Sequence, residues 1–193
     1  MRLGILGSGS GSNMQAILDG VADGSLKAEI ALVLSDNPQG YILERAQKAG
    51  IPTGVIDCRG FKSKFPEEAQ QETADALKAA GVDLVCLAGF MRLVRAPLLE
   101  AFPGRILNIH PALLPAFPGL QAWQQAIDAG IPETGCTVHY VDGGMDSGPV
   151  ILQEKVPVLP GDTPDSLHAR ILEAEHRTYP EAIRMVAAKL GIE

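Results

Sequence analysis

The chain has 193 residues, with 16 Lys and Arg against 23 Asp and Glu, a formal net charge of −7 and 46% hydrophobic residues. This is the composition of a globular chain, and we expect one domain over residues 1–193 that buries its own core. The acidic balance argues against a nucleic-acid partner and favours a small-molecule substrate. No apolar run approaches the roughly 18 residues of a membrane span, so no membrane partner is expected.

The spacing of the cysteines and histidines argues against a disulfide framework and against a zinc site. Cys58, Cys86 and Cys136 are scattered without Cys-X-X-Cys spacing, which is typical of reduced structural thiols. The apolar run at the start of the chain is too short for the hydrophobic region of a signal peptide, and we expect a cytoplasmic protein. The four histidines show no zinc-ligand spacing, and no metal site is expected.

The first half of the chain alternates between strand and helix patterns. Residues 2–6 predict a strand, which a glycine-rich turn joins to a helix beginning near residue 12. Further strands are expected at 30–34, 53–56 and 82–88, and helices at 41–49 and 66–80. Repeated units of this length predict an α/β fold with an open, doubly wound, mostly parallel sheet, whose ligands lie beyond the carboxyl ends of its strands.

The second half changes character after an apolar run at 105–107. Prolines and a glycine in the segment 108–119 predict a stiff loop, followed by a helix at about 120–129. Strands at 134–141 and 150–158 are joined by a loop and predict an antiparallel edge of the sheet. Thr163 is the expected N-cap of a long last helix that runs to about residue 189, in which Pro180 marks a candidate kink.

The turn Gly7–Asn13 has the character of a phosphate cradle. Bare glycines let backbone N–H groups approach an anion, and the start of a helix adds partial positive charge. The turn completes neither the Walker A motif nor the dinucleotide fingerprint, whose third glycine is replaced by Ser12. Asp36 nevertheless resembles the ribose-binding acid of dinucleotide folds, so an oxidoreductase stays an alternative. The simpler interpretation is a flexible turn.

Asn108 and His110 stand two residues apart at the expected exit of a strand and should point the same way. An imidazole that titrates near neutrality and an amide that donates to an oxyanion suit acyl-type chemistry. Asp142 or Asp146 could orient the imidazole, although both residues also suit simple turns. Without a serine or cysteine nucleophile nearby, the nucleophile would come from the substrate. His139, within an alternating strand, is expected to be structural.

Six stretches follow one another along the chain: Gly9–Asn13, Ala88–Arg92, Leu107–Pro111, Leu113–Pro115, Asp146–Ile151 and Glu175–His176. Together and in this order they resemble motifs of the glycinamide ribonucleotide transformylase family, and the resemblance extends along nearly the whole chain. The resemblance implies a Rossmann-like formyltransferase fold. It also implies transfer of a formyl group from 10-formyltetrahydrofolate to the amine of glycinamide ribonucleotide (GAR), in de novo purine biosynthesis, by a monomer or homodimer.

The resemblance also implies roles for individual residues. Asn108, His110 and Asp146 match the catalytic trio, and the GAR phosphate and ribose would be bound by Gly11, Ser12, Asn13 and Glu175. The expected folate-binding residues are Lys64, Met91, Arg92, Leu93, Val94, Asp142, Gly143, Gly144 and Met145. The chain departs from the relative compared at Ala116 and at Gln121–Trp123, outside the trio. Leu114-Pro115 matches a family cis-proline site.

Three kinds of alternative compete with this expectation: other formyl-group enzymes with the same trio, an oxidoreductase and a binding domain without catalysis. Methionyl-tRNA formyltransferase and formyltetrahydrofolate deformylase share the Asn, His and Asp arrangement, but each has an additional domain that we do not expect here. A nucleotide-dependent oxidoreductase would use the glycine turn and Asp36, and would leave Asn108, His110 and Asp146 without a role. A ligand-binding domain without catalysis is the third alternative.

Overall fold

The computed structural model describes residues 1–192 and consists of one seven-stranded sheet with helices on both faces. The strands are β1 (Arg2–Leu6), β2 (Glu29–Ser35), β3 (Thr53–Val55), β4 (Leu84–Leu87), β5 (Ile106–His110), β6 (Glu133–Tyr140) and β7 (Val150–Pro157). The helices are α1 (Ser12–Ala22), α2 (Tyr41–Lys48), α3 (Glu67–Ala79), α4 (Leu98–Ala101), α5 (Ala122–Asp128) and α6 (Pro164–Leu190).

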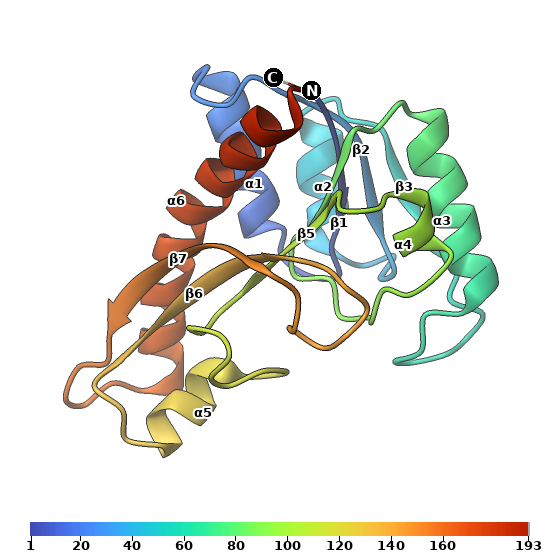
Figure 1. The fold of residues 1–193 in the computed structure, drawn as a ribbon. Coiled ribbons are helices and arrows are strands. Elements are labelled where there is room, and N and C mark those ends of the chain that lie inside the picture. The colour runs from blue at the N-terminus through green and yellow to red at the C-terminus, as the bar shows by residue number, and fades with distance from the viewer. Residues whose placement is uncertain (193) are drawn as a thin grey trace.

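The strand order β3-β2-β1-β4-β5-β6-β7 confirms the predicted fold class (Figure 1). β1 to β5 are parallel, and β6 and β7 add the antiparallel edge. The order reverses between β1 and β4, because the chain leaves the β3 edge and returns beside β1. In open α/β sheets, ligands bind at such a switch point, beyond the carboxyl ends of the strands.

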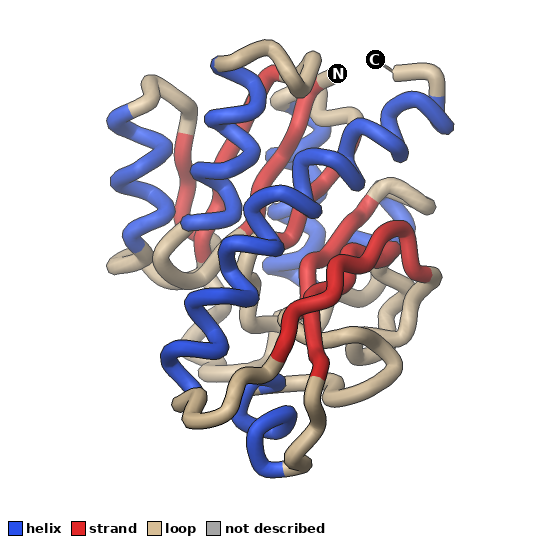
Figure 2. The backbone as a smooth tube through the Cα atoms, turned by 90° about the vertical axis from the view of Figure 1, so that its left-hand side faces the viewer, coloured by secondary structure: helices blue, strands red, loops and turns tan. Residues whose placement is uncertain are grey.

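Two hydrophobic clusters fill the two faces of the sheet. One joins sheet residues such as Leu3 and Ile5 to α1, α2 and α6, and the other joins Leu6 and Val85 to α3 and α4. Residues adjacent in a strand therefore face opposite layers, as strand geometry requires. Figure 2 shows α6 running diagonally across its layer and past the β6–β7 edge.

Helix α6 ties the two parts of the sheet together. Thr163 caps it as predicted, by accepting a hydrogen bond from the Ser166 amide, while the Ser166 hydroxyl accepts one from the Thr163 amide. The helix continues through Pro180 to Leu190. The buried Tyr179 hydroxyl donates to the carbonyls of Leu87 and Leu107, at 2.9 and 3.2 Å, and so joins β4 and β5 just below their ends.

The structure departs from the predicted elements in two places. Asn108 and His110 do not follow β5 but belong to the strand itself, which continues to His110 and pairs with β6 there. Helix α4 was not predicted, since four residues are too short to show a helical period. The three cysteines are buried free thiols, as expected. Among residues 1–192, no helix has the length and apolar character needed to cross a bilayer.

Candidate active site

Asn108, His110 and Asp146, which the sequence assigns to one cluster, lie together at the end of β5. Nδ1 of His110 is 3.4 Å from Oδ2 of Asp146, and Nδ2 of Asn108 is 3.5 Å from Oδ1 of the same carboxylate. His110 is 4% exposed, so this pair is largely removed from water. Nε2 of His110 lies 2.8 Å from the carbonyl oxygen of Phe117, which can only accept a hydrogen bond. Nε2 therefore carries a proton, and a second proton on Nδ1 would face Asp146.

His139 belongs to the same cluster, against the expectation that it is purely structural. It stands opposite Asn108 in the β5–β6 pairing, and its Nε2 lies 3.2 Å from Nδ2 of Asn108 and 3.8 Å from Asp146. Its Nδ1 faces the carbonyl oxygen of Tyr140 at 2.8 Å and so is the protonated nitrogen. Its Nε2 is therefore the nitrogen that faces both the Asn108 amide and the Asp146 carboxylate. Only the pairing register reveals this, and the sequence does not give that register.

Asp146 is held in an ionised state between the two histidines. Burial opposes its charge, but hydrogen bonding with His139 and the Gly119 amide, together with the charge of His110, outweighs burial, so the pKa of Asp146 is lowered. The Gly119 amide donates to Oδ2 at 2.8 Å. Asp146 has a φ of 50°, in the left-handed region that few non-glycine residues adopt. The loop thus fixes a negative charge beside His110.

The Pro-rich loop after β5 is hydrogen bonded to β6. The Thr137 hydroxyl on β6 donates to the Ala112 carbonyl at 2.7 Å and accepts from the Leu114 amide at 3.0 Å. The peptide between Leu114 and Pro115 is cis, in agreement with the family site. The loop therefore presents the Phe117 carbonyl and the Gly119 amide to the cluster from a rigid support.

The predicted phosphate turn lies at the start of α1, beyond the end of β1. Gly11 is the N-cap, with a φ of 73°, and no side chain caps the helix. A Cβ on Gly11 would approach Cα of Ile42 to 2.7 Å, so glycine is required there for conformation and for space. The first amides of α1 are consequently free of side-chain caps, as an anion site at a helix start requires.

Glu175 of α6 contacts this turn across the α1–α6 packing. The Asn13 amide nitrogen donates to Oε2 of Glu175 at 2.7 Å, and both residues are buried, at 8% and 4% exposure. Burial raises the pKa of Glu175 to about 7, although the Asn13 hydrogen bond acts in the opposite direction. The structure thus brings together two residues 162 positions apart that the sequence assigns to one substrate.

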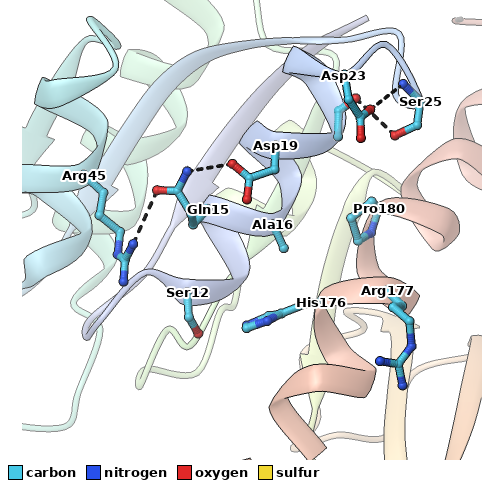
Figure 3. Close-up of a pocket in the computed structure, with 11 residues that line it drawn as sticks. Ser12, Gln15, Ala16, Asp19, Asp23, Ser25, Arg45, His176, Arg177 and Pro180 are labelled. Atoms are coloured by element: carbon cyan, nitrogen blue, oxygen red, sulfur yellow. Dashed lines mark hydrogen bonds between the residues drawn. The ribbon is translucent and has the colours of Figure 1, made fainter.

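A cavity of about 610 Å³ adjoins this turn, between α1 and α6 (Figure 3). Ser12 and His176 lie near one another at one end, Arg45 donates to Gln15 at 3.4 Å on one side, and Asp19 and Asp23 line the far end. Nε of Arg45 donates to the Ser10 carbonyl at 2.8 Å and so supports the turn. No motif in the sequence marks Arg45, because a single charged residue on a helix forms no recognisable pattern.

Some of the expected folate-binding residues have exposed side chains, whereas others are buried or hydrogen bonded within the protein. Met91, Leu93 and Met145 are exposed, at 60%, 37% and 58%. Val94 is 2% exposed and packs in the core, so only its backbone is accessible to a ligand. Lys64 is exposed, with Nζ 5.1 Å from the centre of the Phe61 ring.

Asp142 stabilises a turn, which is one of the two roles that the sequence allows for it. Its Oδ1 accepts from the Gly144 amide and the Ser147 hydroxyl, both at 2.9 Å, and these bonds lower its pKa. Gly143 is tied to the 89–95 loop, because Nη1 of Arg95 donates to its carbonyl. The two loops assigned to folate are therefore in contact.

Asp36 is unsuited to the oxidoreductase alternative. Its Oδ1 accepts from the Ser8 hydroxyl and its Oδ2 from Nε of Arg92, each at 2.5 Å, and its side chain is 8% exposed. A carboxylate that binds a ribose diol must be free to accept its hydroxyl protons. Asp36 is instead satisfied within the protein.

Comparison with known proteins agrees with this arrangement. Residues 1–183 match the family model described as formyl transferase. Phosphoribosylglycinamide formyltransferase of Bacillus subtilis is 40% identical over 185 residues, which cover 96% of this chain and 94% of that protein. The trifunctional purine biosynthetic protein adenosine-3 of Drosophila melanogaster is 48% identical over 187 residues, and the chain spans 14% of its length.

Solved structures show the same similarity in three dimensions. Glycinamide ribonucleotide transformylase 1 from Symbiobacterium toebii has a TM-score of 0.94 and 54% sequence identity, over 98% of this chain and 88% of that chain. Phosphoribosylglycinamide formyltransferase from Bacillus halodurans has a TM-score of 0.92 and 44% identity, over 98% and 97% of the two chains.

Proposed function

Because the chain belongs to the formyl transferase family, we propose that it transfers the formyl group of 10-formyltetrahydrofolate to the amine of GAR, giving formyl-GAR and tetrahydrofolate. The resemblance to glycinamide ribonucleotide transformylases is confirmed by relatives that match nearly the whole chain, and the protein is an enzyme of formyl transfer in purine biosynthesis. The choice of donor, the acceptor position and the roles of the residues are the proposal.

The observation that carries the mechanism is the buried contact between His110 and Asp146, with Asn108 beside it. An acid, a base and an amide donor are present, whereas the three cysteines of the chain are buried as structural thiols. A site that supplies proton transfer and oxyanion stabilisation without a nucleophile requires the substrate to provide one. The primary amine of GAR can serve as that nucleophile.

In the proposed reaction, the amine nitrogen attacks the formyl carbon, and the carbonyl oxygen becomes an oxyanion. The Asn108 amide and the positive charge of the His110 imidazolium stabilise this oxyanion, while Asp146 stabilises the imidazolium. A proton then passes from the attacking nitrogen to N10 of the folate, helped by Asp146 and water. The bond between the formyl carbon and N10 breaks, and tetrahydrofolate leaves.

The two substrates would lie on opposite sides of this cluster. The GAR phosphate would bind the free amides of Gly11, Ser12 and Asn13, and its ribose hydroxyls would donate to Glu175. The folate would lie along residues 91–94 and the 142–146 loop, with Lys64 near its acidic tail. The turn at 11–13 follows β1, residues 91–94 follow β4 and the 142–146 loop follows β6, while Lys64 lies between β3 and α3 and Glu175 lies in α6.

The test is formyl transfer from 10-formyl-5,8-dideazafolate, followed by absorbance with and without GAR. Release of the deformylated folate that depends on GAR supports the proposal. Release without GAR would favour a deformylase, and no release under either condition would contradict formyl transfer between these substrates.

A further inference from the structure

A buried polar network joins the loops that follow the first four parallel strands. The Ser8 hydroxyl donates to Oδ1 of Asp36, and Nε of Arg92 donates to Oδ2, each at 2.5 Å. The Met91 amide donates to Oγ of Ser8 at 3.0 Å, and the Ser8 amide donates to the Gly89 carbonyl at 3.1 Å. The phosphate turn and the 89–94 loop are thus fastened together at the switch point of the sheet.

The Arg92 guanidinium has further partners in the same network. Its Nη1 donates to the carbonyls of Phe61 and Lys64, at 2.8 and 2.5 Å. These bonds hold the loop between β3 and α3, from which Lys64 extends. Most of the hydrogen-bonding capacity of Arg92 is therefore used inside the protein, on a side chain that is only 8% exposed.

Because the Asp36–Arg92 ion pair is buried, it contributes little to the free energy of unfolding but holds the attached loops in fixed positions. Desolvation of two charges offsets most of their attraction, whereas removal of one partner leaves an unpaired buried charge. The hydrogen bonds of the network connect the loops after β1, β2, β3 and β4, and so fix where these four loops lie relative to one another. Two of the loops carry residues that the proposed function assigns to the phosphate of GAR and to the folate.

We propose that Ser8, Asp36 and Arg92 form a positioning unit, in which Arg92 sets the affinity for the folate through Asp36 and not by direct contact with the folate. This inference rests on the proposed function, and it changes the role expected for Arg92. The exposed side chains of Met91 and Leu93, on either side of Arg92, would then be the ones that meet the ligand.

The experiment compares two formyl donors in three variants. One donor is 10-formyl-5,8-dideazafolate, and the other is its pteroate analogue without the glutamate tail. The variants are Asp36→Asn, which keeps the shape and removes the charge, Arg92→Gln, and the two together. KM for each donor, KM for GAR, kcat and the thermal midpoint are measured for each variant.

For a positioning unit, each single variant raises the donor KM about tenfold or more, since small misplacements of binding loops are costly. The rise is equal for both donors, and the double variant is no worse than either single one. A direct Arg92–glutamate contact predicts otherwise: Arg92→Gln weakens only the donor with the glutamate tail, and Asp36→Asn has no effect. That pattern would overturn the inference, and so would a fall in thermal midpoint with unchanged KM values.

Two further variants complete the design. Arg184→Gln removes an exposed ion pair with Glu181 on α6 and should leave every kinetic constant unchanged. Ser8→Ala retains the buried ion pair, so it tests the network even where Arg92→Gln fails to fold, and it too should raise the KM of both donors equally. Failure of the proposed function would appear as a lack of GAR-dependent turnover in the wild type and in Arg184→Gln. Failure of the inference would appear in the network variants alone.

Discussion

Nδ1 of His110 lies 3.4 Å from Oδ2 of Asp146, while Nε2 of the same ring is bound to the Phe117 carbonyl. The backbone bond fixes the proton on Nε2, so a change in protonation occurs at Nδ1, beside the carboxylate. The charge of Asp146 therefore lies beside the atom where a proton would be held or released. Phe117 lies in the Pro-rich loop after β5 and Asp146 in the loop between β6 and β7, so two loops orient the ring before any substrate binds.

The first prediction concerns His110. His110→Ala should lower kcat by about 10²–10⁴-fold, the usual contribution of a positioned acid or base, while the fold is retained. Steady-state kinetics and circular dichroism check this result. The matched control is His168→Ala, because His168 stacks on Trp123, with ring centroids 3.7 Å apart, and does not belong to the cluster. Equal losses in the two variants would contradict a specific role for His110.

Asp146→Asn tests the charge rather than the shape of the same pair. The amide occupies similar space but does not favour an imidazolium, so the basic limb of the pH–rate profile should move to lower pH and kcat should fall. The measurement is kcat as a function of pH for the wild type and the variant. A profile of unchanged shape would show that Asp146 does not sustain the charge of His110.

Glu175 should make the ligand-free protein less stable as the pH rises. Its pKa in the folded chain is about 7, above the ordinary 4.5, so the folded state retains a proton that the unfolded state releases. The stabilisation is complete below pH 4.5 and is lost as the pH rises through about 7. Glu175→Gln should remove this part of the pH dependence, which urea denaturation of both proteins across that range measures.

The same carboxylate predicts how GAR affinity changes with pH. Ribose hydroxyls donate to the ionised form, so KM for GAR should fall as the pH rises towards 7, and Glu175→Gln should weaken binding most at the alkaline end. Parallel KM curves for the two proteins would argue that Glu175 does not contact the substrate.

The sequence predicts local features well and pairings between distant segments poorly. Proline and glycine identify the rigid loop after β5 and the turn before α1, because these residues restrict or permit backbone conformations on their own. The position of His139 depends instead on which residue of β6 faces Asn108, and the partners of Asp36 depend on the order of strands. Neither is encoded in any short stretch, and the resemblance to a family placed Arg92 with the folate without revealing its buried ion pair.

Gly11 and Gly9 form a matched pair within the phosphate turn. Gly11→Ala should destabilise the protein by about 1 kcal/mol or more, because a side chain there meets the Ile42 backbone and must adopt a φ of 73°. It should also raise KM for GAR. Gly9→Ala should do neither, since a Cβ at Gly9 meets nothing within 4 Å. Thermal denaturation and KM for GAR check both variants, and similar behaviour of the two would refute the specific requirement at residue 11.

Tyr179→Phe tests whether the core hydroxyl supports the site from below. The hydroxyl bonds the carbonyls of Leu87 and Leu107, so its removal leaves buried acceptors short of a donor and should cost about 1–2 kcal/mol of unfolding free energy. Tyr41→Phe is the control, because Tyr41 is a surface residue of α2 that is 44% exposed. Chemical denaturation measures both. If Tyr179→Phe lowered kcat as well as stability, the link between α6 and the end of β5 would also align Asn108 and His110, whereas an unchanged kcat would confine Tyr179 to the core.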